Sequence, residues 1–332
     1  MLQERLLKII QRFPEQKLLI VGDTIADKFL YGSISRVSRE APVFILRHES
    51  TETVPGGAAN CALNLAALGA NVSLVSIAGN DEAGAALRDK LSVAGVNVQG
   101  LLLSDEIQTT TKLRILAGHS HANKQQVIRV DYEDAPLNNA GLRDSINAKL
   151  KSSLSAAGAV ILSDYNYGLV DQQTIELMRE TQQAKKIPVL VDSRSRLSDF
   201  SGFTAATPNQ DEVEHLIGAA VESTEKLEMA AGRLQEELQL EALLVTRGSR
   251  GMMLLTSNAK PLHIAAVGAQ AVDGTGAGDT VIATFALGLA SGATFEEAAQ
   301  LANYAGGLVV MKRGTASVTA AELEQAINDS KP

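Results

Sequence analysis

Short apolar runs recur along the 332-residue chain and constrain its fold more than any other feature. Five of them lie at residues 18–21, 72–77, 159–162, 189–191 and 243–245. A strand that is apolar along both faces must be covered on both faces, as in a parallel sheet between two layers of helices. The sequence therefore predicts an α/β fold with a mostly parallel sheet covered on both faces, and the length fits one large domain or two small domains.

The segments between these runs carry helical patterns. Leu227, Ala231 and Leu234 share one face of a predicted helix, and residues 58–69 are rich in helix formers and end at a glycine. Residues 1–13 mix charged side chains with apolar positions at helical spacing. This pattern predicts an amphipathic helix rather than a signal peptide.

Composition narrows the class of protein. The formal net charge is −8, which argues against general binding to nucleic acid or to an anionic membrane surface. The lone cysteine, Cys61, excludes a disulfide framework and indicates a reducing compartment. No apolar run approaches the roughly 18 residues of a membrane-spanning helix. We therefore expect a cytoplasmic protein.

Two stretches, 27–47 and 109–132, break the alternation of apolar strands and helices. In both, apolar and polar residues alternate on either side of a polar turn, as half-buried antiparallel strands require. Four such strands predict a small antiparallel sheet, which we call the lid, with one face over a cleft and the other free to pack on a second copy. His119 and His121, in the second turn, lack a third metal ligand nearby, so we expect a mobile loop there.

The segment richest in chemical information is residues 273–280, which read DGTGAGDT directly before a helical pattern. Closely spaced glycines at a helix start let backbone N–H groups converge on an anion, which the helix dipole also favours. Asp279 falls beside them, where a carboxylate can accept a proton from a substrate hydroxyl. A tight turn with an N-cap carboxylate would account for the same residues without any chemistry.

Two other glycine motifs fit less well. A dinucleotide fingerprint normally lies in the first βα turn, whereas this segment lies near the C-terminus. The chain also contains no GxxxxGK[ST] sequence, which excludes a P-loop mechanism.

A second glycine cluster, PGGAAN at residues 55–60, also opens a helical pattern, and GDTIAD follows the first apolar run at residues 22–27. Adjacent glycines permit close approach of the backbone to a ligand, and an asparagine can donate to and accept from a sugar hydroxyl. Together these segments and residues 273–280 resemble the ribokinase-like (PfkB) family of carbohydrate kinases over nearly the whole chain. The resemblance implies the ribokinase-like fold, with a doubly wound, mostly parallel sheet, in a single kinase domain spanning residues 1–332.

The resemblance also implies roles for individual residues. The sugar would be held by four residues, Asp27, Gly56, Gly57 and Asn60. The anion hole would be formed by Gly276, Ala277 and Gly278, and Asp279 would deprotonate the hydroxyl that attacks the γ-phosphate of ATP.

Further matches to the family imply which residues lie beside the nucleotide and which hold cations. NQDE at residues 209–212 looks like the family's NxxE, with Asn209 near the nucleotide and Glu212 organising Mg²⁺ through water; alone, these residues would be a helix cap. The residues expected beside the nucleotide are Asn209, Thr246, Gly248, Gly251, Gly276, Gly278 and Asn303. Asp273 and Thr275 lie where relatives bind a monovalent cation, which suggests K⁺.

Within the family, several segments are most similar to the heptose 7-phosphate kinase branch, including SRVSREAPV at 35–43 and NKQQVIRVD at 123–131. That branch phosphorylates the anomeric hydroxyl of D-glycero-D-manno-heptose 7-phosphate in lipopolysaccharide core synthesis. Tyr167 replaces the branch's lysine in SDYNYG, and DSRS at 192–195 replaces its DPKG. A different phosphorylated or acidic sugar is therefore the alternative acceptor. The chain's end soon after the kinase region predicts the stand-alone kinase rather than a fused form.

Two anionic substrates need local positive charge in an acidic protein. The candidates are Arg36, Arg39, Lys112, Arg114, Lys124, Arg129 and Arg194. We expect at least two of them to reach a phosphate, and we place Arg114, Arg129, Asp164 and Arg194 on the substrate side. Cys61, directly after Asn60, is expected to be a small buried helix residue, although a helix start can also lower a thiol pKa.

The leading hypothesis is an ATP- and Mg²⁺-dependent sugar-phosphate kinase that forms a homodimer through the lid. A non-catalytic sugar-binding regulator is disfavoured by the presence of Asp279, because a binder gains nothing from a base. A nicotinamide-dependent oxidoreductase is the third hypothesis, and it requires tight NAD binding.

Overall fold

The computed structural model describes residues 2–118, 124–134, 137–257, 259–268 and 271–330. Its main sheet has nine strands in the order β13-β12-β11-β10-β9-β8-β1-β4-β5, parallel except at the β11–β12–β13 edge. The five apolar runs form β1, β4, β8, β9 and β11, as predicted. The strand bounds are β1 (Lys17–Gly22), β4 (Asn71–Gly79), β5 (Asn97–Ser104), β8 (Ala159–Asp164), β9 (Val189–Ser193), β10 (Ala205–Ala206), β11 (Ala242–Thr246), β12 (Met252–Thr256) and β13 (Leu262–Ile264).

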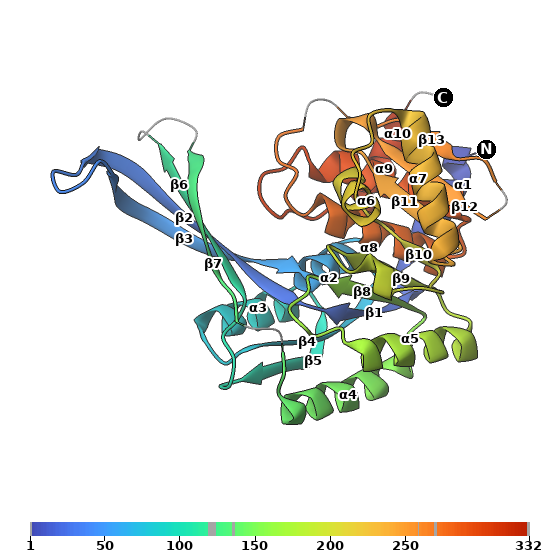
Figure 1. Ribbon diagram of the computed structural model, residues 1–332, viewed down its shortest axis with the longest axis horizontal. Helices are drawn as coiled ribbons and strands as arrows, with labels where there is room; N and C mark the ends of the chain where they lie inside the picture. Colours follow the sequence, from blue (N-terminus) through green and yellow to red (C-terminus); the bar gives the residue numbers. More distant parts are fainter. Residues whose placement is uncertain (1, 119–123, 135–136, 258, 269–270, 331–332) are drawn as a thin grey trace.

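Helices cover both faces of this sheet (Figure 1). One apolar cluster is built on α1 (Leu2–Ile10), α2 (Ala58–Ala67), α8 (Ala277–Ala290), α9 (Phe295–Val309) and α10 (Ala320–Asp329), with α3 (Glu82–Val93) beside them. The other is built on α4 (Ala140–Leu154), α5 (Gln172–Lys185), α6 (Gln210–Ile217) and α7 (Thr224–Glu237). Short 3₁₀ turns occupy Phe13–Glu15, Leu197–Asp199 and Gly248–Arg250. The predicted helices at the N-terminus, at 58–69 and at 227–238 are therefore confirmed.

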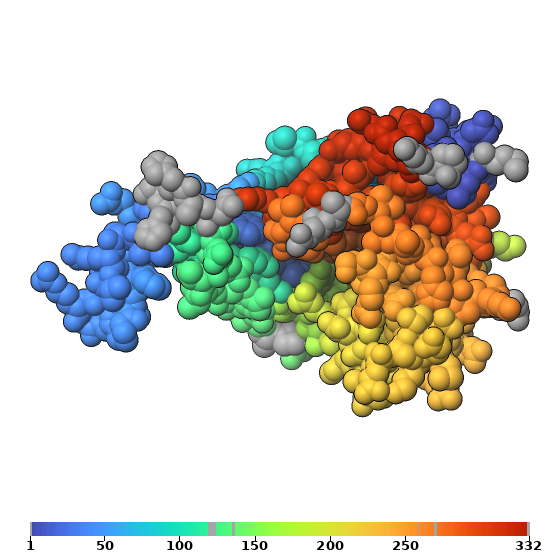
Figure 2. Space-filling model, turned by 90° about the horizontal axis from the view of Figure 1, so that it is seen from above, coloured from blue at the N-terminus to red at the C-terminus, as the bar shows by residue number. Residues whose placement is uncertain are grey.

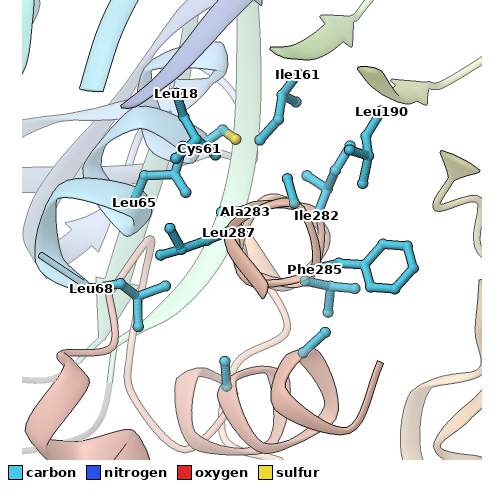
Figure 3. Packing of buried hydrophobic residues seen from close by; sticks show 14 of the residues in the cluster. Leu18, Cys61, Leu65, Leu68, Ile161, Leu190, Ile282, Ala283, Phe285 and Leu287 are labelled. Atoms are coloured by element: carbon cyan, nitrogen blue, oxygen red, sulfur yellow. The ribbon is translucent and has the colours of Figure 1, made fainter. Parts of the chain in front are cut away.

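Helix α8 is the central helix of the first cluster. Its residues from Asp279 to Gly288 are all buried, because it packs on α2, on α9 and on the sheet. Figure 3 shows Cys61 and Leu65 of α2 on one side of α8 and Leu190 of β9 on another. A helix buried all round is held rigidly, so the residues at its N-terminus have fixed positions.

The lid consists of β2 (Thr24–Val37), β3 (Phe44–Gly57), β6 (Thr111–Gly118) and β7 (Gln125–Tyr132), in the order β3-β2-β6-β7. The pairs β2–β3 and β6–β7 are antiparallel, as predicted, whereas the central pair β2–β6 is parallel. Both central strands follow parallel strands of the main sheet and so leave it in the same direction. The ribbon and space-filling views both show β2 and β3 extending beyond the rest of the molecule (Figures 1 and 2).

The first lid hairpin is longer than the predicted stretch 27–47, because β3 continues to Gly57. Its middle section is polar and exposed, so it lacks the apolar alternation that marks a strand in a sequence. The predicted loop with His119 and His121 lies outside the described residues. No helix in the described ranges is both long and apolar enough to cross a membrane.

Candidate active site

A cavity of about 350 Å³ lies at the carboxyl ends of the parallel strands, where open α/β sheets bind ligands. It brings together twelve of the predicted site residues: Asp27, Gly57, Arg114, Asp164, Arg194, Asn209, Glu212, Thr246, Thr275, Gly276, Gly278 and Asp279. Eight predicted residues are not in its lining: Gly56, Asn60, Arg129, Gly248, Gly251, Asp273, Ala277 and Asn303. The lid contributes directly to the cavity through β2 and β6.

Asp279 stands in the first turn of α8, at the wall of this cavity. Its carboxylate accepts two hydrogen bonds, from Asn60 Nδ2 at 2.7 Å and from the Tyr165 hydroxyl at 3.2 Å. These donors come from α2 and from the loop after β8, so three distant parts of the chain fix one carboxylate. The carboxylate faces the same cavity as Gly57 of the early glycine cluster.

Burial raises the pKa of Asp279 to about 6, while the hydrogen bonds from Asn60 and Tyr165 oppose that rise. The negative charge of Asp27 adds to it. A carboxyl group with such a pKa is mostly ionised at pH 7, yet it accepts a proton more readily than an exposed aspartate. Burial also raises the pKa of Tyr165 far above its usual value, so its hydroxyl remains a donor.

Glycine is required at position 276 for two reasons. Its φ of 77° lies in the left-handed region, and a Cβ there would lie 2.6 Å from Asn60 Nδ2. Any side chain would therefore push Asn60 away from Asp279. A Cβ at Gly278 would meet nothing within 4 Å.

The start of α8 offers unpaired backbone donors to the cavity. The Ala277 N–H donates to the Gly274 carbonyl at 3.2 Å, which closes the turn. Within the described chain, the N–H groups of Gly278 and Asp279 have no backbone acceptor. These are the orphan donors expected in the first turn of a helix, and they suit an anion.

The side of the cavity predicted to hold the acceptor is built where the lid meets the main sheet. Asp27 of β2 forms an ion pair with Arg114 of β6. A Cβ at Gly56 would lie 2.4 Å from Asp27 Oδ2, so the glycine lets the strand pack against this carboxylate. Gly57 has a φ of 57° and its Cβ would lie 2.6 Å from the Asp23 carbonyl oxygen.

Asp23 organises the loop after β8, a role that the sequence analysis missed. Its carboxylate accepts from the backbone N–H groups of Tyr165 at 2.8 Å, Tyr167 at 3.1 Å and Leu169 at 3.2 Å. Burial, followed by the negative charge of Asp164, raises the pKa of Asp23 to about 6 despite these three donors. The loop that carries Tyr165 is therefore attached to the end of β1.

Asp164 and Arg194 both line the cavity but differ in their contacts. Asp164 is buried and accepts from the Ser193 hydroxyl at 2.7 Å, and burial raises its pKa. Arg194 is exposed, and its Cζ lies 5.1 Å from the centroid of the Tyr165 ring. Arg129 lies on the exposed strand β7 and pairs with Asp131 at 2.9 Å, away from the cavity.

Asn209 and Glu212, which were predicted to lie on the nucleotide side, form the capping box of α6, so the helix-cap interpretation of NQDE is confirmed. Both also line the cavity beside Thr246. Gly248 and Gly251 lie on the turn between β11 and β12, where Gly251 has a φ of 80°. Buried Asn303 donates to the Ala265 carbonyl at 2.8 Å.

The segment before α8 is fixed by Asp273, whose carboxylate accepts from the backbone N–H groups of Thr275 and Gly314, each at 2.9 Å. Nowhere in the described part of the chain do three or more His, Cys, Asp or Glu side chains form a group able to hold a metal by themselves. Cys61 is buried, as expected, and burial raises the pKa of its thiol well above the usual value, so it is not activated by the helix start.

Several cavity residues were not predicted as site residues: Ile25, Lys112, Tyr165, Asp192, Thr207, Gly274 and Thr315. Lys112 was only one of seven candidate cations, and Tyr165 and Asp192 were noted only as members of branch motifs. The signal available in the sequence was a polar residue directly after the apolar runs at 159–162, 189–191 and 243–245, since the carboxyl ends of parallel strands meet at one edge.

Comparison with known proteins defines the class. Residues 15–321 match the model of the pfkB family carbohydrate kinases, and the chain belongs to this family. It is thus a carbohydrate kinase, a phosphotransferase.

Curated relatives are similar over nearly the whole chain. The bifunctional protein HldE of Hahella chejuensis is 41% identical over 323 residues, covering 96% of this chain and 65% of that protein. The protein of the same name from Shewanella piezotolerans is 43% identical over 321 residues, with the same coverage. The chain therefore spans 65% of the length of these relatives.

Solved structures confirm the ribokinase-like fold. Ribokinase of Arabidopsis thaliana complexed with ribose and ATP superposes with a TM-score of 0.73 at 21% identity, covering 95% of this chain and 99% of that one. Phosphofructokinase-2 of Escherichia coli in complex with potassium superposes with a TM-score of 0.77 at 19% identity. The match covers 94% of this chain and 98% of that one.

Proposed function

We propose that this protein transfers the γ-phosphate of ATP to the anomeric hydroxyl of D-glycero-D-manno-heptose 7-phosphate, giving the 1,7-bisphosphate. The resemblance of several segments to the heptose 7-phosphate kinase branch supports this acceptor. The similarity of about 40% to proteins named HldE is consistent with it.

One observation carries the kinase chemistry: the buried carboxylate of Asp279 lies beside the free amides of the α8 N-terminus, in a cavity that also contains Asp27 and Gly57. The acceptor hydroxyl attacks the γ-phosphorus and its proton passes to Asp279. The new O–P bond forms as the bond to the ADP oxygen breaks. The amides of Gly278 and Asp279 donate to the transferring phosphoryl group, whose charge they stabilise.

Magnesium fits the donor set of this cavity. Glu212 and Asp192 both line it, and burial is the largest cause of the raised pKa of each, with neighbouring carboxylates adding to it. Carboxylates that repel one another are stabilised by a divalent cation. Glu212 would hold Mg²⁺ through water, and the ion, when bound, neutralises charge on the ATP phosphates. We also propose K⁺ at the backbone carbonyls of Asp273 and Thr275.

The acceptor is tested by measuring ADP release from ATP with a panel of heptose, hexose and pentose phosphates and their unphosphorylated counterparts. We expect the highest kcat/KM with D-glycero-D-manno-heptose 7-phosphate. A higher kcat/KM with another sugar would show that the proposed acceptor is wrong, while the kinase activity itself would stand. No ADP release with any sugar would favour a non-catalytic binder.

We further propose that the protein is a homodimer that pairs through its lid. Strand β7 is exposed along its whole length, and the lid carries exposed apolar side chains. These are Val37, Val43, Phe44, Val127, Ile128, Val130 and Tyr132. Apolar patches of this kind mark surfaces that bind another protein chain.

A further inference from the structure

The structure separates the seven candidate cations into two groups. Five are paired with a carboxylate or exposed outside the catalytic cavity: Arg36, Arg39, Arg114, Lys124 and Arg129. The other two, Lys112 and Arg194, line the cavity, as does Arg114, which is paired with Asp27. Across the described ranges, neither of these two side chains forms an ion pair or a hydrogen bond.

Lys112 and Arg194 meet at the ring of Tyr165. Lys112 Nζ lies 5.7 Å from the centroid of that ring and 5.8 Å from the Tyr167 ring, and Arg194 Cζ lies 5.1 Å from the Tyr165 centroid. Lys112 is only 6% exposed. Burial is the largest cause that lowers the pKa of Lys112, and the positive charge of Arg194 adds to it, while the carboxylates of Asp131, Glu133 and Asp27 oppose it.

Bringing these two positive charges close together costs free energy. Burial removes hydration from the Lys112 ammonium group and Arg194 adds repulsion. The carboxylates of Asp27, Asp131 and Glu133 form no ion pair with it and offset only part of this cost. Cation–π contacts with the tyrosine rings recover only part of that loss. A doubly charged phosphate ester would turn the repulsion into two attractions, since guanidinium binds it bidentately and ammonium binds it as a point charge.

The two cations lie on the acceptor side of the cavity. Lys112 pairs in register with Asp27 on the neighbouring strand β2. The Tyr165 hydroxyl contacts Asp279 while its ring contacts both cations. An anion bound by Lys112 and Arg194 is therefore separated from Asp279 by the side chain of Tyr165. A sugar phosphate would fit this spacing, with its reacting hydroxyl at Asp279 and its phosphate group at the two cations.

We propose that Lys112 and Arg194 form the subsite for the phosphate group of a phosphorylated acceptor. Lys112, from the lid, supplies the positive charge that Tyr167 lacks. The inference rests on the proposed function and deepens it, because it assigns the acceptor to the sugar monophosphates rather than to neutral sugars.

The test measures KM values by coupled ADP release for the full chain and three variants, Lys112→Met, Arg194→Met and the control Arg88→Met. Arg88 is exposed on α3 beside Asp89, outside the cavity, and its replacement removes the same charge. The acceptors are D-glycero-D-manno-heptose 7-phosphate and the unphosphorylated heptose. Thermal unfolding is recorded in parallel.

We expect each cavity variant to raise KM for the phosphorylated acceptor roughly 10- to 100-fold, the range for a lost charge-assisted hydrogen bond. KM for the unphosphorylated heptose and for ATP should stay close to wild type, as should every value of Arg88→Met. Lys112→Met should unfold at the same temperature or higher, because it removes a buried, repelled charge, whereas a structural role predicts destabilisation.

Three results would overturn the inference: unchanged KM for the phosphorylated acceptor, equal weakening of both acceptors, or an effect confined to ATP. If wild type phosphorylates heptose 7-phosphate and the variants do so with unchanged KM, only the inference fails. If wild type uses only unphosphorylated sugars, the proposed acceptor fails with it.

Discussion

At the scale of single residues, Gly276 combines a left-handed backbone with close contact to the side chain that holds Asp279. We expect Gly276→Ala to displace Asn60 from Asp279, because its Cβ would lie 2.6 Å from Asn60 Nδ2. Turnover should fall at least about tenfold, through misplacement of the base. Gly95→Ala is the matched control, since Gly95 also has a positive φ of 84° but its Cβ would meet nothing within 4 Å. Both variants should lose about 1 kcal/mol or more of stability from left-handed strain, but only Gly276→Ala should lose activity.

The pKa of Asp279 sets the expected acid limb of activity. Its carboxyl group has a pKa of about 6 and must be ionised to accept a proton, so kcat/KM should fall as pH drops through about 6. Tyr165→Phe removes a hydrogen bond that stabilises the ionised form, so the limb should move to higher pH. Tyr304→Phe, whose hydroxyl contacts Ser330 outside the cavity, should leave the pH profile unchanged. A limb that stays in place in Tyr165→Phe would contradict this role of the tyrosine.

The local motifs predicted Asp279, Gly276 and Asn60 as site residues, because each lies in a short glycine-rich segment whose residue types alone indicate a binding function. They could not predict that Tyr165 contacts Asp279, since the two are 114 residues apart and meet only once β8 and α8 are packed. The three-amide contact of Asp23 is hidden for the same reason: its partners are backbone groups, which leave no trace in residue type.

At the scale of elements, the loop from β8 to α5 depends on Asp23. Asp23→Asn retains the shape but places an amide N–H₂ against backbone N–H groups, so the loop should shift. We expect KM for the sugar phosphate to rise and kcat to fall, each about tenfold or more, with KM for ATP nearly unchanged. Asp171→Asn, at the N-cap of α5, is the control and should change only stability slightly. Equal effects of Asp23→Asn on both substrates would indicate a general structural role.

The predicted elements were most accurate where apolar periodicity was strong, as for β1, β8 and α7. Strand β3 was predicted too short because residues 48–52 are polar and exposed. The parallel pairing of β2 with β6 is a long-range property of the chain path, so strand-by-strand patterns do not show it. Strand β10 has only two residues, too few for any periodicity.

At the scale of the whole molecule, the proposed dimer depends on the exposed apolar face of the lid. Ile128, on β7, is 53% exposed, and Ile128→Asp places a charge in the proposed interface. Solution scattering should give a dimer mass for wild type and a monomer mass for this variant. Val93→Asp is the control, because Val93 is 91% exposed on α3, outside the lid, and should stay dimeric. A monomeric wild type, or a dimeric Ile128→Asp, would contradict pairing through the lid.

The central claim is that Asp279 takes the proton of the acceptor hydroxyl. Three distant segments, α2, the loop after β8 and α8, meet to hold this carboxylate in place. The direct test is single-turnover phosphoryl transfer by Asp279→Asn, with ATP affinity measured by calorimetry on the same sample. We expect the rate to fall about 10²- to 10⁴-fold while ATP affinity stays near wild type. Phosphoryl transfer by Asp279→Asn at the wild-type rate would contradict the account.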